Sequence, residues 1–255
     1  MNNIWLVYKK ELRSYFASPI AYVIMALYSL IFGIFFYSAV KYFQQLATQA
    51  QMMGRSFPMN INEMIVGPVL MNTSVIGLFL IPMICMRLFA EEKRSGTIEL
   101  LMTSPIRDVE LILGKWLAAV ALYVVILIVS AVNLTFLFAY GKPDWKPIAV
   151  GYLGLLLEGA SLLAIGTFIS TLTKNQIVAG VAGFCVSLLL WVLEWTTAFE
   201  SSVTSKVLGY LSVVTHFEPF TKGVLDSKDV VFFLSAIFLG LFLTARSTES
   251  LRWRA

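Results

Sequence analysis

Residues 91–105 read EEKRSGTIELLMTSP, a charged stretch between two long runs of apolar residues. As a helix, this stretch places Ile98, Leu101 and Met102 on one side, at spacings of three and four, and leaves most of its charges free to face water. A helix of this length is unstable alone in water, so it must pack against another part of a protein. Two interpretations are open: a solvated loop between membrane helices, or a helix that docks a partner protein.

The composition of the whole chain is that of an integral membrane protein. Hydrophobic residues make up 58% of the chain and charged residues 13%, and the mean hydropathy is +0.81. Soluble domains have about 45–50% apolar and about 25% charged residues. Inside lipid, each backbone N–H and C=O must be paired within its own segment, so the apolar runs are predicted to be helices.

Six windows of the sequence are apolar and long enough to cross a bilayer as helices. They are predicted at residues 20–40, 64–86, 116–139, 147–173, 175–193 and 230–245. The last window is short, with about 16 residues, and suits a locally thinned bilayer or a span extended by flanking residues. The predicted fold is therefore all-α, a single polytopic membrane domain over residues 1–255 with six transmembrane helices.

The distribution of basic residues predicts the orientation in the membrane. With six spans both termini share one side, and that side, which also carries residues 91–105, holds 12 of the 19 Lys and Arg residues. Basic residues close to the membrane favour the cytoplasmic side. We therefore expect a multi-pass protein of the cell (cytoplasmic or inner) membrane with both termini in the cytoplasm.

Residues 1–19 carry a second amphipathic pattern, which predicts a helix lying in the cytoplasmic membrane interface. Apolar side chains on one face are Ile4, Val7, Tyr8, Leu12, Tyr15 and Phe16, and basic side chains on the other are Lys9, Lys10 and Arg13. The alternative is an ordinary cytosolic tail. The scattered charges argue against a signal peptide, and Ser18-Pro19 is expected to end the helix and turn the chain into the membrane.

Two long connections are predicted on the opposite side of the membrane. Residues 41–63 are polar and indicate a simple loop. Residues 196–228 carry apolar residues at helical spacing and suit one or two short helices that lie on, or dip into, the outer leaflet. His216, the only histidine, makes neither a metal site nor a triad alone, and we interpret it as structural.

Polar residues inside the predicted spans are candidates for intramembrane function. Glu158 is the only formal charge deep in a span, and Asn72 and Asn133 lie inside two others. An unpaired carboxylate there costs several kcal/mol. Glu158 either lines a substrate path or an interface, or is a neutral carboxyl group hydrogen-bonded to a neighbour such as Ser161. Small residues that permit close helix packing surround it, namely Gly151, Gly154, Gly159, Ala160 and Ala164.

Motifs for catalysis or nucleotide binding are absent from the sequence. It contains no H-E-x-x-H, no G-x-S-x-G and no G-x-x-x-x-G-K-[ST] phosphate loop. Cys85 and Cys185 both lie within predicted spans, where packing is a more plausible role than a disulfide. We therefore predict no catalytic residues, no metal and no cofactor in this chain, and no nucleic-acid partner.

The charged stretch and the residues after it resemble a known signature. The run from Glu92 to Pro105, followed by Leu113-Gly114-Lys115, is similar to the signature of ABC-2-type exporter permeases. That signature has an acidic and a basic residue, Gly-Thr, an apolar residue, Glu, a Leu-rich pair and Ser/Thr-Pro, with Gly-Lys opening the next helix. The segments 10–19 and 216–233 further resemble the permease subgroup associated with gliding-motility transporters.

The resemblance implies a subunit of an ATP-driven exporter. Two six-span permeases, identical or related, would pair in the lipid bilayer, and each would dock a separate ABC ATPase subunit that binds ATP and Mg. The segment 91–105 would be the cytoplasmic coupling helix, with the interfacial N-terminal helix beside it. By resemblance, the ATPase-coupling residues are Glu91, Glu92, Arg94, Gly96, Thr97, Ile98, Glu99, Leu101 and Met102.

Three other functions were weighed against this one. An ion-coupled secondary transporter usually has repeated halves and several buried ionisable residues, whereas this sequence has one and no evident repeat. A non-transporting membrane assembly subunit is a further alternative within the same family. An intramembrane enzyme lacks any paired catalytic residues.

Overall fold

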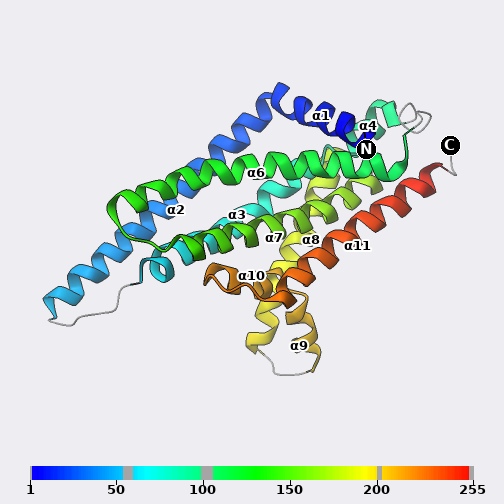
Figure 1. Cartoon of the computed structure of the whole chain (residues 1–255). Helices are drawn as coiled ribbons and strands as arrows, with labels where there is room; N and C mark the ends of the chain where they lie inside the picture. Colours follow the sequence, from blue (N-terminus) through cyan, green and yellow to red (C-terminus); the bar gives the residue numbers. More distant parts are fainter. Residues whose placement is uncertain (1, 54–59, 99–105, 200–202, 253–255) are drawn as a thin grey trace.

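The computed structural model describes residues 2–53, 60–98, 106–199 and 203–252, and all regular elements among them are helices (Figure 1). In chain order they are α1 (Asn2–Ala17), α2 (Pro19–Met52), the π-helix η1 (Asn62–Val66), α3 (Gly67–Cys85), α4 (Ala90–Ser95), α6 (Asp108–Tyr140), α7 (Trp145–Leu172), α8 (Gln176–Phe199), α9 (Val203–Tyr210), α10 (Val213–Thr221) and α11 (Ser227–Arg252).

Six helical stretches of the described residues are long and apolar enough to cross a membrane. They are Pro19–Met52, Asn62–Ser95, Asp108–Tyr140, Trp145–Leu172, Gln176–Trp195 and Ser227–Ser250. The prediction of an all-α polytopic membrane protein with six spans is therefore confirmed. A separate N-terminal helix precedes the first span, and two short helices precede the last, as expected.

Helix α7 lies at the centre of the bundle, because glycines along it let neighbouring helices approach closely. A Cβ atom on Gly154 would lie 2.6 Å from Phe220 Cβ of α10, and one on Gly159 would lie 2.1 Å from Tyr123 Cε1 of α6. In the same way, Gly166 packs against Cys85 at the end of α3. Of the small residues predicted to allow close packing, Gly154 and Gly159 therefore face two different helices, and Gly166, which was not among them, faces a third.

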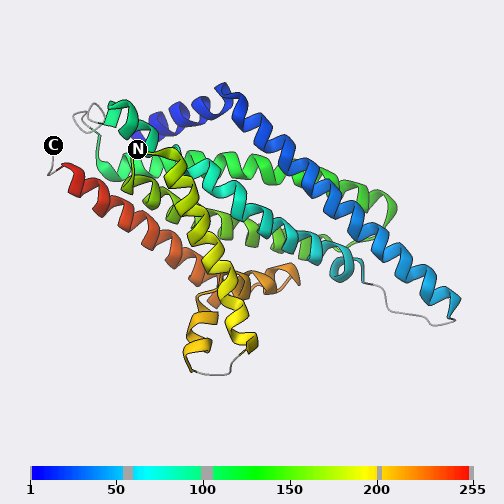
Figure 2. The ribbon, with the colours of Figure 1, turned by 180° about the vertical axis from the view of Figure 1, so that it is seen from behind.

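Helices α2, α8 and α11 lie at the periphery. Only 17% of the most apolar window of each is buried within the chain, against 61% for α7. Viewed from behind, α2 (blue) and α8 (yellow) flank α3 (cyan), and α3 packs against both (Figure 2). These outer helices therefore present apolar side chains to lipid or to another protein.

The first two helices meet at a sharp turn. α1 ends at Ala17, and α2 begins with Pro19 at a position where a helix needs no backbone N–H donor. Ser18 is the N-cap of α2, and its hydroxyl oxygen accepts a hydrogen bond from the backbone N–H of Ile20 at 3.3 Å. The predicted turn at Ser18-Pro19 is present.

Several helices are longer than the apolar windows from which they were predicted. α2 continues to Met52, so the first half of the predicted loop 41–63 is helical, because its Gln, Ala and Leu residues favour helix. α6 begins at Asp108 rather than at residue 116. α11 has 26 residues, so the prediction of a short last span was wrong.

The two ends of the bundle differ in what they carry. The start of α1, the end of α11 and α4 lie close together at one end, while α9 and α10 lie away from it, toward the other (Figure 1). Two chain segments with charged patterns, α1 and α4, therefore meet on the same side.

Candidate functional site

The charged stretch begins with a short helix, α4, that ends at Ser95. Gly96 follows with a φ of 73°, in the left-handed region that glycine adopts without strain. Ser95 Oγ donates to the carbonyl oxygen of Glu91 at 2.9 Å and lies 2.9 Å from Thr97 Oγ1. The prediction of one unbroken helix over 91–105 is thus corrected at Gly96, because a left-handed residue changes the direction of the chain.

The N-terminus of α4 is held by a serine on α7. The backbone N–H groups of Phe89 and Ala90 both donate to Ser170 Oγ, each at 3.1 Å, and that hydroxyl group faces the carbonyl oxygen of Met86 at 3.4 Å. The first N–H groups of a helix have no partner within it, so Ser170 supplies the acceptor that α4 lacks. Ser170 is fully buried.

Further contacts hold α4 to its neighbours. Lys93 Nζ donates to the backbone carbonyl oxygen of Thr171, the residue after Ser170. Thr171 Oγ1 in turn donates to Ser247 Oγ of α11 at 2.7 Å. Glu91 pairs with Arg87, one turn before it, at 2.9 Å. The α4 segment is therefore fixed to the C-terminal end of α7 and, through Thr171, linked to α11.

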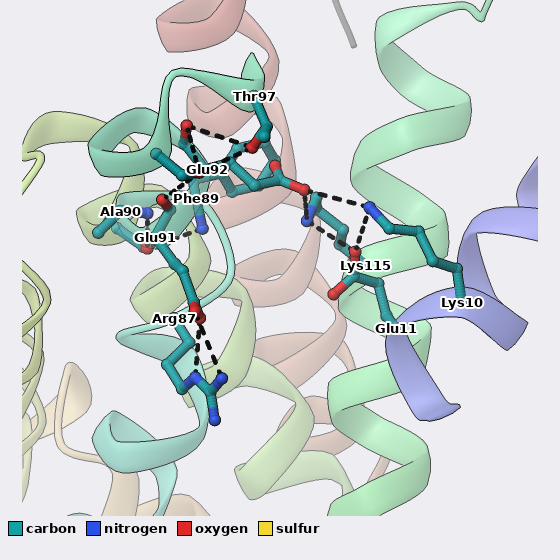
Figure 3. A network of polar contacts seen from close by, with 11 residues as sticks. Lys10, Glu11, Arg87, Phe89, Ala90, Glu91, Glu92, Thr97 and Lys115 are labelled. Atoms are coloured by element: carbon teal, nitrogen blue, oxygen red, sulfur yellow. Dashed lines mark hydrogen bonds and ion pairs between the residues drawn. The ribbon is translucent and has the colours of Figure 1, made fainter. Parts of the chain in front are cut away.

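A network of four charges joins α4 to α1 and α6 (Figure 3). Lys115 Nζ of α6 lies 3.0 Å from Glu11 Oε1 of α1 and 2.7 Å from Glu92 Oε1 of α4. Lys10 Nζ approaches the same two oxygens at 3.5 and 3.6 Å. Lys115 also lies over the ring of Phe89, 5.4 Å from its centroid. We call Lys10, Glu11, Glu92 and Lys115 the four-charge network.

Three of the four side chains in this network are largely buried, so their charges must be balanced within the protein. The Lys115 side chain is 1% exposed, and those of Glu11 and Glu92 are 14% and 11% exposed. Removing a charge from water is costly unless a partner of opposite sign replaces the solvent. Two ammonium groups and two carboxylates balance here. The Lys10 side chain is 62% exposed, so it is the loss of Lys115, Glu11 or Glu92 that leaves an uncompensated charge in a largely dry site. The network therefore fixes the relative positions of α1, α4 and α6.

Close packing reinforces the contact between α1 and α6. A Cβ atom on Gly114 would lie 2.7 Å from Val7 Cβ, so only glycine lets α1 approach to this distance. Asn3 Nδ2 donates to Glu110 Oε2 at 3.0 Å, nearer the start of both helices.

A further hydrogen bond joins α1 to α3. Tyr15 donates its hydroxyl proton to the carbonyl oxygen of Ile84 at 3.2 Å. Burial raises the pKa of Tyr15 well above its ordinary value, which keeps that donor protonated.

The predicted coupling residues fall into three groups. Arg94, Gly96 and Thr97 are exposed, and Ile98 is half-buried. Glu91 is half-buried and Glu92 is buried inside the four-charge network. The remaining residues lie outside the described part of the chain, namely Glu99, Leu101 and Met102. Glu92 therefore faces the bundle. We call Arg94, together with the exposed residues Gly96 and Thr97 that follow the end of the helix, the exposed tip of α4.

Sequence reasoning gave no contact role to Lys115, Glu11 or Ser170. Lys115 and Glu11 both stood in the motifs on which the resemblance rested, but the partner of each is far away in sequence. A signal was present in the charges themselves: Lys115 directly precedes an apolar span, where an unpaired charge would be unfavourable. Ser170 carries no such signal, because serine inside a span usually bonds to its own helix.

Glu158 is enclosed by helices of its own chain and is 2% exposed. Ser74 Oγ of α3 donates to Glu158 Oε1 at 2.5 Å, whereas Ser161 Oγ donates to the backbone carbonyl oxygen of Glu158. The carboxyl group is thus hydrogen-bonded, but its partner is Ser74 and not the suggested Ser161.

The other two intramembrane candidates, Asn72 and Asn133, are half-buried, and neither side chain makes a hydrogen bond within the described residues. Within those residues, no three metal-ligating side chains come together.

Replacing Ser170 by alanine is expected to loosen α4 without unfolding the bundle. Two backbone N–H groups lose their acceptor, at a cost of about 1–3 kcal/mol. Hydrogen–deuterium exchange should become faster at Phe89 and Ala90 and stay unchanged in the centre of α7. Ser235→Ala, which removes an exposed hydroxyl group that bonds only to Phe232 of its own helix, serves as the control. Unchanged exchange at Phe89 and Ala90 would exclude Ser170 as their acceptor.

Comparison with known proteins points to a transporter family. The profile of the family described as ABC-2 family transporter protein matches residues 5–201, which include the four-charge network and α4. The chain is also similar to the probable multidrug ABC transporter permease YbhR of Escherichia coli strain K12 and of Escherichia coli O157:H7. Each is 28% identical over 137 residues, or 53% of this chain and 37% of the relative, so the alignment spans well under half of those proteins. The gliding-motility subgroup stays a prediction.

Proposed function

Because the chain belongs to the ABC-2 family of transporter proteins, we propose that it is the permease subunit of an ATP-driven exporter. In this proposal the exposed tip of α4 contacts a separate ABC ATPase subunit, which binds ATP and Mg and hydrolyses the nucleotide. The end of the bundle that carries α4, the start of α1 and the end of α11 is then cytoplasmic. The substrate leaves toward the end that carries α9 and α10.

One observation carries the proposal: a short helix with an exposed tip is rigidly joined to several membrane helices. α4 follows α3 directly, is bonded to α7 through Ser170 and is joined to α1 and α6 through the four-charge network. A solvated loop, the alternative considered from sequence, needs none of these contacts. A force applied at the tip of α4 acts on α3, α6 and α7 together.

The contacts divide the charged residues of α4 into two roles. Glu92 holds α4 to the permease, because its side chain is buried against Lys115. Arg94 points away from the described bundle and is available to a partner. Arginine is enriched among the residues that dominate protein–protein binding energy, and exposed charges set register and association rate. Arg94 is therefore our first candidate for the ATPase contact.

A second permease completes the proposed transporter. The apolar faces of α2 and α8 are covered only slightly within one chain, and α3 lies between them. A second copy of this chain, or a related permease, covers such a face without exposing polar backbone to lipid. The substrate would then pass between the two permeases.

The docking role is tested with Arg94→Glu. The tagged chain is purified from its own membranes in mild detergent, and ATP hydrolysis in the eluate is measured. The wild-type eluate should hydrolyse ATP. The eluate of the variant should have about one tenth of that activity or less, which corresponds to a loss of about 1.4 kcal/mol in binding free energy. Lys206→Glu, a matched charge reversal on exposed α9, should retain it. Full ATPase recovery with Arg94→Glu, at equal amounts of folded permease, would contradict docking through this residue.

A further inference from the structure

A buried histidine and aspartate lie near the bundle end opposite α4. His216 of α10 and Asp229 of α11 are 2% and 0% exposed. His216 Nδ1 lies 2.7 Å from Asp229 Oδ1, and His216 Nε2 lies 2.9 Å from the backbone carbonyl oxygen of Tyr210, the last residue of α9. The imidazole ring of α10 thus bonds to the helices on either side of it in the sequence, α9 and α11. Both residues follow the region that the family profile matches.

Aromatic rings enclose the imidazole. The ring of Phe232 stacks on it at a centroid distance of 3.9 Å, and the ring of Tyr210 meets it edge-on at 4.8 Å. The ring is 2% exposed, so water is largely excluded from it, and its two nitrogens are its polar atoms. Their hydrogen bonds are therefore made inside the protein, where an unpaired polar group is costly.

The two acceptors determine the proton count of the pair. A carbonyl oxygen cannot donate, so Nε2 must carry a proton to bond to Tyr210. The contact between Nδ1 and Asp229 Oδ1 needs a second proton, which makes an imidazolium beside a carboxylate. If that proton moves from Nδ1 to the Asp229 carboxylate, the pair still holds two protons and its net charge is still zero. Removal of either proton leaves one of the two contacts as a repulsion between lone pairs.

We infer that His216 and Asp229 form a two-proton lock that positions α9 against α10 and α11. The inference rests on the proposed function only in naming this side as the exit side of the transporter. His216 and Asp229 are positioning residues, since neither is placed on a substrate path. When one proton leaves, the tautomer with Nδ1–H retains the stronger bond to the carboxylate. The bond to Tyr210 is then lost, and α9 is released.

Other charged groups near the pair are already engaged. Lys228, beside Asp229, pairs with Asp226 at 3.2 Å, is largely exposed, and also interacts electrostatically with Asp229. Glu218 on α10 pairs with Lys222 at 2.7 Å, also in an exposed position. Glu194 on α8 interacts electrostatically with Glu218.

The other helices packed on α10 bring backbone and apolar groups to it. α7 meets α10 through Gly154, which faces Phe217 and Phe220, and the start of α3 meets it through Gly67, which faces the carbonyl oxygen of Thr221. The imidazole and its aspartate are thus the buried titratable pair of this contact, and surface charges paired elsewhere do not replace the lost proton.

The proton count is measured directly by nitrogen-15 NMR of the histidine ring. His216 is the only histidine of the chain, so labelled histidine gives one ring signal pair, provided that the affinity tag contains no histidine. While the lock is closed, Nε2 should be bonded to hydrogen, and Nδ1 should either carry the second proton or accept a hydrogen bond from the Asp229 carboxyl group. Raising the pH should remove one proton in a single step. An unprotonated Nε2 in the state in which α9 is held in place would overturn the lock.

The position of α9 is measured in parallel by the distance between spin labels at Lys206→Cys on α9 and Ser227→Cys on α11, in a Cys185→Ala background. Both labelled positions are exposed. A longer distance population should appear over the same pH range in which the ring loses its proton. His216→Gln should populate that longer distance at all pH values, while Glu218→Gln, an exposed change on the same helix, should behave as the unmutated chain does.

Two results would overturn the inference: ring deprotonation without movement of α9, or an unchanged pH response in His216→Gln. The ring measurement needs no substitution, so it stays decisive if His216→Gln does not fold. Both measurements use the permease chain in lipid nanodiscs without an ATPase. Failure of the docking test with Arg94→Glu therefore leaves their outcome unaffected, and the reverse also holds.

Discussion

Replacing Lys115 by methionine is expected to destabilise the permease by about 3–5 kcal/mol and, in the proposed function, to abolish ATP-driven transport. These are the losses expected when one partner of a buried ion pair is removed and the other charge is left uncompensated. Methionine keeps the length and apolar character of the lysine stem, so the effect isolates the ammonium group. In the variant, the only cation left near the two carboxylates is Lys10, whose side chain is 62% exposed. Its Nζ lies 3.5 Å from Glu11 Oε1 and 3.6 Å from Glu92 Oε1.

The measurement is thermal unfolding in detergent, followed through the fluorescence of the six tryptophans. Lys222→Met breaks an exposed ion pair with Glu218 and should leave the unfolding temperature nearly unchanged. Lys115→Met combined with Glu92→Gln should regain much of the lost stability, because one carboxylate and Lys10 then remain balanced. A Lys115→Met variant as stable as the wild-type chain would mean that the network contributes nothing.

Replacing Gly240 by leucine is expected to separate α11 from α7. A Cβ atom at Gly240 would lie 2.7 Å from the carbonyl carbon of Ala164 and 2.9 Å from Ile165 N, so it would meet the backbone of the facing helix. Backbone cannot rotate away as a side chain can. Overpacking costs about 1–3 kcal/mol where side chains adjust, and this contact should exceed that range.

The contact is tested by the fraction of protein that elutes as a single folded species after mild heating. Gly240→Ala should lose part of this fraction and Gly240→Leu nearly all of it. Gly33→Ala provides the matched control, because a Cβ atom on Gly33 of α2 meets nothing within 4 Å. If Gly240→Leu withstands heating as well as Gly33→Ala does, then α7 and α11 do not approach as closely as these distances require.

The spans and the amphipathic face of α1 could be predicted from sequence because they depend on local pattern. A run of apolar residues must be a helix in lipid whatever its neighbours are. The apolar face of α1 was identified by helical spacing, and Val7 and Tyr15 on that face are buried. These properties need no knowledge of which helix packs against which.

The candidate site could be predicted only in part, because its key contacts join distant segments. Lys115 and Glu11 are 104 residues apart, and Ser170 lies 81 residues from Phe89. Periodicity placed α4 near the membrane but could not indicate that Glu92 turns inward. The start of α6 was missed for a related reason. Residues 108–115 include charged side chains and were therefore left out of the predicted span. Lys115 is nevertheless tolerated in the helix, because two carboxylates lie close to it.

The separation between Glu11 and Lys115 also has a consequence for biogenesis. A chain growing from its N-terminus exposes Glu11, and later Glu92, before Lys115 has been synthesised. Until that residue emerges, α1 has no buried cation to bind, and the first two spans cannot reach their final arrangement. Insertion of the third span therefore completes the packing of the first two, and a nascent chain arrested before residue 115 is expected to leave Glu11 and Glu92 without their buried cation.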